Sequence, residues 1–206
     1  MTFIRTLKYG KSQVIKDVAF CTLLKNKLPN DNKPFDELIA DFDKEVRKID
    51  KSVTKDALNN VHGDWYEWLL AIAAWNFCVE NKKAHLPLLT PNVSQFDIAK
   101  LYNDKLYNLI QDLRDKVLTS SSVQLISSNP DFVIIDRTLV NKIFPKLDKI
   151  TAIDQAAILK IETAYKAFET QCGFDDIHGY FSVKTSFRPD RRLQIPHEGS
   201  LMKAIY

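Results

Sequence analysis

The chain has 206 residues, of which 45% are hydrophobic and 27% are charged, and its formal net charge is +3. This composition is that of a soluble globular protein, and the longest apolar run, Trp68 to Phe77, is about half of the roughly 20 residues that span a bilayer. The N-terminus lacks the apolar core of a signal peptide, and three widely spaced cysteines without a CxxC pair favour reduced thiols over a structural zinc site. We therefore expect a cytoplasmic protein with one domain, residues 1–206, and no membrane association.

Helical spacing dominates the first half of the chain. Apolar residues recur there at intervals of three and four, as they do on the buried face of a helix. The predicted helices cover residues 14–28, 35–46, 63–81 and 96–117, and a short extended segment covers residues 85–89. Gly63-Asp64 marks the start of the third helix, which is rich in apolar residues.

The second half of the chain contains short β-branched runs bounded by Ser, Asn and Pro, which predict strands. The predicted strands cover residues 122–126, 132–135 and 179–184, and helical spacing returns over residues 153–172 and from residue 198. The sum is an α/β fold, with a small mixed central β-sheet flanked by helices.

Two ends of the predicted strands carry residues that suit phosphodiester chemistry. Asn129-Pro130-Asp131 precedes an apolar strand, which places the carboxylate of Asp131 at the start of that strand. A turn-forming aspartate explains the same pattern. Ser182 and Lys184 alternate with Val183 and therefore share one face of another strand, although a lysine there also reaches water without any function.

Two glutamates complete this set of residues. Glu198 comes at the start of the last predicted helix, where a carboxylate also interacts favourably with the helix dipole. Glu67 lies three residues after Asp64, and the pair matches a capping box, which does not exclude a second role. Carboxylates that converge with a lysine at a sheet edge suit Mg²⁺, which binds few carboxylates together with substrate phosphate. Such a metal stabilises charge on a phosphoryl oxygen, and the lysine orients the attacking water.

A local basic patch lies in residues 184–192, with four positive side chains and one negative side chain. A patch of this kind on a chain of nearly neutral charge suits an anionic partner such as DNA. Within the patch, Arg188-Pro189-Asp190-Arg191 places two arginines beside an acid. Arginine bonds to O6 and N7 of guanine and an acid accepts from N4 of cytosine, so the set matches G·C pairs. A solvated turn with an internal Arg–Asp pair explains the same residues.

The segment Ser182 to Tyr206 resembles the type II restriction endonucleases that cut RCCGGY and related CCGG-centred sites. These enzymes belong to the PD-(D/E)xK superfamily, with NgoMIV and SgrAI as more distant relatives. The similarity also covers Gly63-Asp64-Trp65-Tyr66-Glu67-Trp68 and Ser128-Asn129-Pro130-Asp131, in the same order and at compatible distances. The resemblance implies a restriction-endonuclease-like fold in a bacterial protein. It also implies Mg²⁺-dependent cleavage that leaves 5′-phosphate and 3′-hydroxyl ends.

The resemblance implies a role for each of these residues. Asp131 and Glu198 correspond to the paired metal-binding carboxylates, and Lys184 corresponds to the catalytic lysine. Ser182 occupies the position at which most nucleases of the superfamily have their second acid, which in this family is displaced to Glu198. Glu67 corresponds to an additional acid near a second metal ion. The residues that recognise the central CCGG correspond to Arg188, Asp190 and Arg191.

The resemblance also implies a partner and an assembly. The expected partner is double-stranded DNA with a CCGG core, bound by a homodimer or homotetramer. Family members continue beyond the position of Tyr206, so we expect a chain that is short at its C-terminal end. The missing part would supply some outer-base contacts and much of the oligomer interface. The alternative hypothesis is an inactive remnant that binds CCGG-containing DNA or interferes with the assembly of a full-length enzyme.

Overall fold

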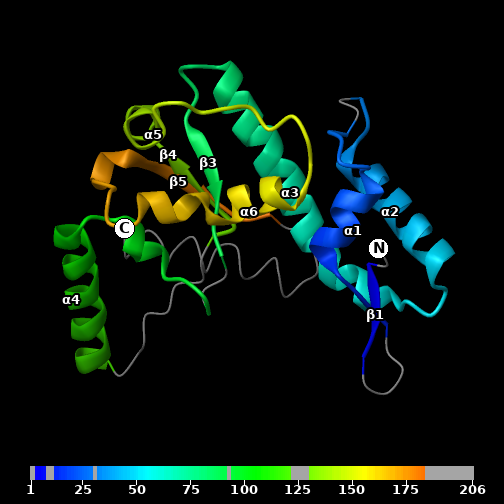
Figure 1. The fold of residues 1–206 in the computed structure, drawn as a ribbon. Coiled ribbons are helices and arrows are strands. Elements are labelled where there is room, and N and C mark those ends of the chain that lie inside the picture. Colours follow the sequence, from blue (N-terminus) through cyan, green and yellow to red (C-terminus); the bar gives the residue numbers. More distant parts are fainter. Residues whose placement is uncertain (1–2, 8–11, 30–31, 92–93, 122–129, 184–206) are drawn as a thin grey trace. The chain divides into compact units, whose positions relative to one another are not determined.

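The computed structural model describes most of the chain, namely residues 3–7, 12–29, 32–91, 94–121 and 130–183 (Figure 1). Contacts divide the chain into two compact units, and each is described by itself. The first unit comprises residues 1–80 and 148–161, and the second comprises residues 81–147 and 162–206. Among the helices in the described ranges, none is long and apolar enough to cross a membrane.

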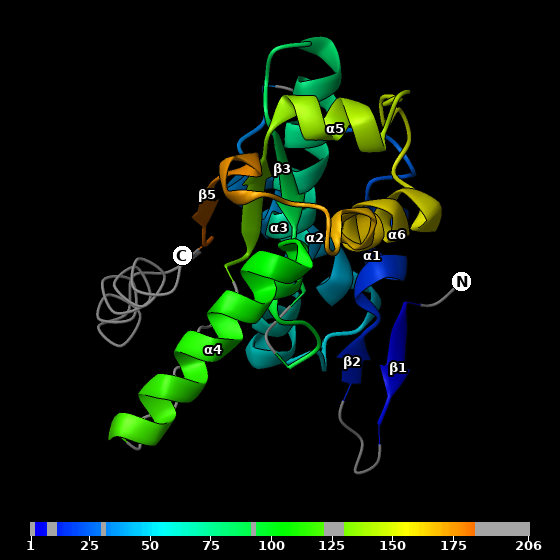
Figure 2. The same ribbon diagram turned by 90° about the vertical axis from the view of Figure 1, so that its left-hand side faces the viewer.

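The first unit begins with a short hairpin, which Figure 2 shows as two strands side by side. Strand β1 (Ile4–Thr6) pairs antiparallel with β2 (Ser12–Val14). Helix α1 (Lys16–Leu23) follows, and it ends where Lys25 and Asn26 adopt φ angles of 54° and 55°. The predicted helix over residues 14–28 is therefore too long at both ends, because Val14 belongs to a strand and left-handed residues stop α1.

Two longer helices supply most of the core of the first unit. Helix α2 (Phe35–Ile49) begins after Pro34, as the sequence predicts, and buries the apolar face that the spacing defines. Its buried residues are Leu38, Ile39, Phe42 and Val46. Helix α3 (Lys55–Glu80) packs against α2, with the Phe42 and Trp65 rings edge to face at a centroid distance of 5.4 Å. Such aromatic pairs stabilise a core beyond the area that they bury.

Helix α3 starts eight residues earlier than the sequence predicts, so Gly63-Asp64 is not its N-terminus. Gly63 lies inside the helix, and a Cβ there would meet no atom within 4 Å. The carboxylate of Asp64 pairs with Lys16 at 2.8 Å and is not a helix cap. The capping-box interpretation of Asp64 and Glu67 is therefore wrong. A glycine inside a helix costs about 1 kcal/mol, which burial of neighbours such as Leu58 and Trp65 outweighs.

The buried side-chain amide of Asn76 in α3 binds the second segment of the first unit, residues 148–161. The side chain of Asn76 donates to the carbonyl of Ile150 at 2.9 Å and accepts from the Ile150 N–H at 2.8 Å. Nearby, the ammonium of Lys160 lies over the ring of Trp75, 4.6 Å from the ring centroid. Lys160 belongs to α6 (Gln155–Thr163), which with the 3₁₀ turn η3 (Ala164–Phe168) replaces the single predicted helix over residues 153–172.

The second unit is built on a three-stranded antiparallel sheet, in which Figure 1 shows β4 between β3 and β5. The strands are β3 (Leu86–Leu89), β4 (Phe132–Ile135) and β5 (Ile177–Phe181). The first two match the predicted segments closely. The central strand β4 is almost wholly buried, which explains its run of apolar residues.

Shorter elements complete the second unit. The predicted helix over residues 96–117 is broken into a 3₁₀ turn, η2 (Ile98–Leu101), and α4 (Asp104–Ser121). Asn103 causes the break, because its side chain accepts from the Leu106 N–H at 3.1 Å and so caps α4. The remaining elements are α5 (Arg137–Ile143) and the 3₁₀ turn η4 (Phe174–Asp176). The predicted strand over 122–126 and the predicted helix from 198 lie outside the described residues.

Candidate active site

Asp131 lies at one end of the three-stranded sheet, directly before β4. The register pairs Phe132 with Leu89 of β3 and with Phe181 of β5. Because both pairings are antiparallel, the residues that follow β3 and β5 lie beside the residue that precedes β4. The rings of Phe132 and Phe181 stack with their centroids 4.6 Å apart, which holds this end of the sheet together.

Three hydrogen bonds fix the Asp131 segment between its two neighbours. On the β3 side, the Thr90 backbone N–H donates to the Asp131 carbonyl at 3.0 Å. The hydroxyl of Thr90, a buried residue, donates to the carbonyl of Pro130. On the β5 side, the backbone N–H of Val183 donates to Oδ2 of Asp131 at 2.5 Å. The half-buried carboxylate of Asp131 is therefore held at the point where the chain leaves β5.

Ser182 lies at the same end of the sheet. It stands between Phe181, which pairs with Phe132, and Val183, which contacts Asp131. Its side chain is exposed. The predicted strand over residues 179–184 is shifted, because β5 starts at Ile177 and ends before Ser182. The structure thus brings Ser182 and Asp131 to one place, although Ser182 does not belong to a strand.

The described structure does not place the other predicted site residues beside Asp131 and Ser182. Glu67 is half-buried in α3, which belongs to the first unit, whereas Asp131 and Ser182 belong to the second. Five predicted site residues lie outside the described residues: Lys184, Arg188, Asp190, Arg191 and Glu198. Their roles, and that of Glu67, remain predictions.

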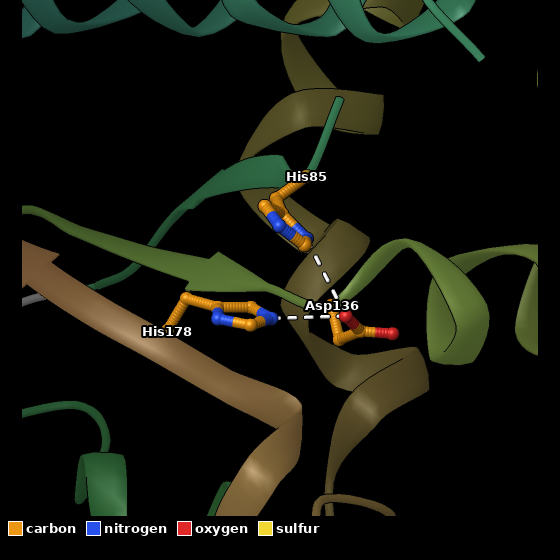
Figure 3. Close-up of side chains that lie close together, drawn as sticks. All are labelled: His85, Asp136 and His178. Atoms are coloured by element: carbon orange, nitrogen blue, oxygen red, sulfur yellow. Dashed lines mark hydrogen bonds and ion pairs between the residues drawn. The ribbon is translucent and has the colours of Figure 1, made fainter. Parts of the chain in front are cut away.

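Two features near the sheet are missing from the sequence-based predictions. The first is Thr90, whose support of Pro130 and Asp131 follows only from the pairing of β3 with β4. The second is a cluster of His85, Asp136 and His178 at the opposite end of the sheet (Figure 3). These three residues are far apart in the sequence, and no motif joins them.

The carboxylate of Asp136 is the centre of this cluster. His178 Nε2 lies 2.9 Å from Oδ2 of Asp136, and His85 Nδ1 lies 3.5 Å from the same oxygen. The pKa of Asp136 is lowered to about 2, mainly by the hydrogen bond with His178 and further by the backbone N–H of Thr138. Asp136 is therefore ionised throughout the neutral range.

The cysteine thiols belong neither to the Asp131 end of the sheet nor to the cluster of His85, Asp136 and His178. Cys21, Cys78 and Cys172 are buried and form no disulfide. Burial is the main cause that raises the pKa of Cys21 to about 11 and that of Cys172 to about 12. A thiol with so high a pKa is a poor nucleophile and a poor metal ligand at neutral pH.

The fold of the chain matches that of restriction endonucleases of known structure. A crystal structure of the type IIF restriction endonuclease Bse634I with cognate DNA matches 99% of this chain and 73% of that one, with a TM-score of 0.85 and 30% identity. A second structure of Bse634I restriction endonuclease matches 99% of this chain and 72% of that one, with a TM-score of 0.82 and 30% identity. The predicted α/β fold of the restriction-endonuclease type is thereby confirmed.

Sequence comparison narrows the class to one family. The Cfr10I/Bse634I restriction endonuclease family model matches residues 6–206. The type II restriction enzyme Cfr10I of Citrobacter freundii is 37% identical over 202 residues, which are 97% of this chain and 70% of that enzyme. The chain belongs to the Cfr10I/Bse634I restriction endonuclease family, and it is a type II site-specific deoxyribonuclease. Enzymes of this type use divalent metal ions. The more distant relationship to NgoMIV and SgrAI remains a prediction.

Proposed function

We propose that the chain hydrolyses double-stranded DNA at an RCCGGY-like site, with Mg²⁺ as the cofactor. The observation that supports this proposal most strongly is the position of Asp131 against Val183. Lys184 follows Val183 directly in the sequence, so the predicted metal ligand and the predicted catalytic lysine belong to adjoining segments. A carboxylate and a lysine are the pair that phosphodiester hydrolysis requires in the family.

The described part of the site fits Mg²⁺. Its donor is a carboxylate, and Mg²⁺ prefers oxygen ligands from one or two carboxylates together with waters and phosphate. Oδ2 of Asp131 accepts the Val183 N–H, and the residue is half-buried at one end of the sheet. Asp131 and Glu198 would hold the metal, with Glu67 near a second ion. When bound, Mg²⁺ neutralises charge that develops on the phosphoryl oxygen.

The residues of the chain act on the attacking water and on the phosphate. The oxygen of water forms a bond to phosphorus while the bond from phosphorus to the 3′ oxygen breaks, which leaves a 5′-phosphate and a 3′-hydroxyl. The proton lost by the water balances the proton gained by the 3′ oxygen. Lys184 orients the water and offsets negative charge in the transition state. Ser182, in the exposed position beside Asp131, leaves the second acidic ligand to Glu198.

Sequence recognition is assigned to the basic patch that follows β5. Arg188 and Arg191 would bond to guanine in the major groove, and Asp190 would accept from cytosine N4. This patch begins directly after the residue that contacts Asp131. Base recognition and phosphodiester cleavage would therefore take place near each other. We further propose a single-domain enzyme of the bacterial cytoplasm that works as a homodimer or homotetramer.

Cleavage of a defined plasmid tests this proposal. One plasmid carries a single RCCGGY site, and the matched plasmid carries the same site with its central CCGG changed to CTAG. With Mg²⁺, the first plasmid is linearised and the second is not. Sequencing of the ends would locate the cut within the site. If folded protein binds the site in Ca²⁺ but cuts neither plasmid in Mg²⁺, the proposed hydrolysis is wrong.

A further inference from the structure

Three side chains of the types that ligate metals, two histidines and one aspartate, meet at the end of the sheet opposite to Asp131. His85 directly precedes β3, and Asp136 directly follows β4. The antiparallel register places Leu86 opposite Ile135, so the end of β4 lies beside the start of β3. His178 lies near the start of β5, at the same end. Antiparallel pairing therefore brings together His178 of β5 and the two residues that adjoin β3 and β4.

The three side chains face one another, as Figure 3 shows. Both imidazole rings point to Oδ2 of Asp136, at 2.9 Å from His178 and 3.5 Å from His85. The ring centroids of the two histidines are 3.9 Å apart, and the ring planes are tilted by 36°. One ligand atom from each residue lies within 4.8 Å of the other two. A tetrahedral zinc site needs separations of about 3.3 Å, so small rotations of exposed side chains suffice.

The other oxygen of Asp136 is already occupied. Oδ1 accepts the backbone N–H of Thr138 at 2.6 Å, and this bond fixes the plane of the carboxylate so that Oδ2 faces the histidines. A second hydrogen bond that orients a ligand in this way is typical of protein metal sites. The side chains of His85 and His178 are 41% and 42% exposed, so an ion reaches them from solvent.

We propose that His85, Asp136 and His178 bind a divalent transition-metal ion, with Zn²⁺ as the best fit. Two imidazoles and one carboxylate are a common ligand set for zinc, and they leave a fourth position for water. His178 binds through Nε2 after a change of tautomer. Binding by His85 Nδ1 replaces a long hydrogen bond of 3.2 Å from the Arg137 backbone. The ion ties the three strands together at one end.

The affinity should be moderate. The N-terminus of α5 adjoins Asp136, and its positive end opposes a cation. We therefore expect a dissociation constant in the micromolar range. This site differs in chemistry from the proposed catalytic site, because imidazole ligands favour zinc whereas carboxylates and water favour Mg²⁺. The zinc proposal does not depend on DNA cleavage, and either proposal can fail alone.

Calorimetric titration of chelator-treated full chain with ZnCl₂ tests the site. We expect one zinc bound per chain with a dissociation constant in the micromolar range, and a rise in Tm when zinc is added. His85→Gln and His178→Gln each remove one ligand at an exposed position and should weaken binding at least tenfold. Asp136→Asn keeps a cap for α5 and should also weaken binding. Each variant is compared with the wild type by circular dichroism to confirm that it is folded.

Two control variants make the result specific. His62→Gln removes a histidine that pairs with Asp43 at 2.7 Å but has no place in the cluster, and it should bind zinc as the wild type does. Asp131→Asn should also keep zinc binding. The proposal is overturned if the wild type binds no zinc, or if His85→Gln and His178→Gln bind it unchanged. It is also overturned if Asp131→Asn alone abolishes binding, because the zinc then occupies the proposed catalytic site.

Discussion

The hydroxyl of Thr90 supports the Asp131 segment, and replacing Thr90 with valine removes this support while keeping the shape of the side chain. The change leaves the carbonyl of Pro130 without the hydrogen bond that it accepts in a buried environment. An unsatisfied buried acceptor costs about 1–3 kcal/mol, and the added methyl group returns up to about 0.8 kcal/mol. The difference is roughly 0.2–2.2 kcal/mol, so we expect a net loss of about 1 kcal/mol in the free energy of unfolding.

Thermal unfolding and single-turnover cleavage measure the two consequences of Thr90→Val. A loss of about 1 kcal/mol lowers Tm by roughly 2–4 °C for a chain of this size. Because small displacements of a catalytic group slow a reaction by up to about a hundredfold, the cleavage rate should fall by about tenfold or more. Thr90→Ser keeps the hydroxyl and is the matched control. The reasoning is refuted if Thr90→Val has the wild-type Tm, or if Thr90→Ser loses as much stability as Thr90→Val.

Three further predictions concern recognition, the core and the thiols. Arg188→Ala should cost roughly 1–3 kcal/mol of discrimination between RCCGGY and single-base variants, and equal losses on all DNA sequences in a binding assay would exclude base recognition. Asn76→Ala leaves the backbone N–H and C=O of Ile150 without the hydrogen bonds that the Asn76 amide makes with them. The free energy of unfolding, measured in urea, should fall by about 2–4 kcal/mol. A loss below about 0.5 kcal/mol would contradict the role of this amide. Ellman's reagent should label no cysteine of the native protein and all three after denaturation, because Cys21, Cys78 and Cys172 are buried; rapid native labelling would contradict this.

Apolar periodicity predicts a helix or strand well where the pattern is strong. The predicted boundaries are wrong where local side-chain interactions or burial compete with the pattern. The helix over residues 35–46 and the strand over residues 132–135 were predictable, because each has a clear apolar pattern and clear boundary residues. Gly63 suggested a helix start that does not exist, since burial along α3 outweighs the preference of one glycine. Asn103 breaks a continuous pattern because its side chain caps α4, a contact that periodicity does not reveal.

Contacts between distant residues were harder to predict than single elements. The sequence singled out Asp131 as a strand-end carboxylate, and the structure adds its neighbour Val183. The cluster of His85, Asp136 and His178 required the strand order and the register, neither of which is encoded in a local pattern. Family resemblance supplied the assignments of the remaining site residues, which composition and spacing alone left open.

Cleavage by Asp131→Asn is the most direct test of the central claim that Asp131 holds the catalytic metal. Loss of the carboxylate charge should slow cleavage of the RCCGGY plasmid in Mg²⁺ by about a thousandfold, which corresponds to roughly 4 kcal/mol. Binding of the same site in Ca²⁺ should persist. Asp175→Asn, at an exposed position in the same unit, should cut as the wild type does. Near-normal cleavage by a folded Asp131→Asn variant would contradict the account.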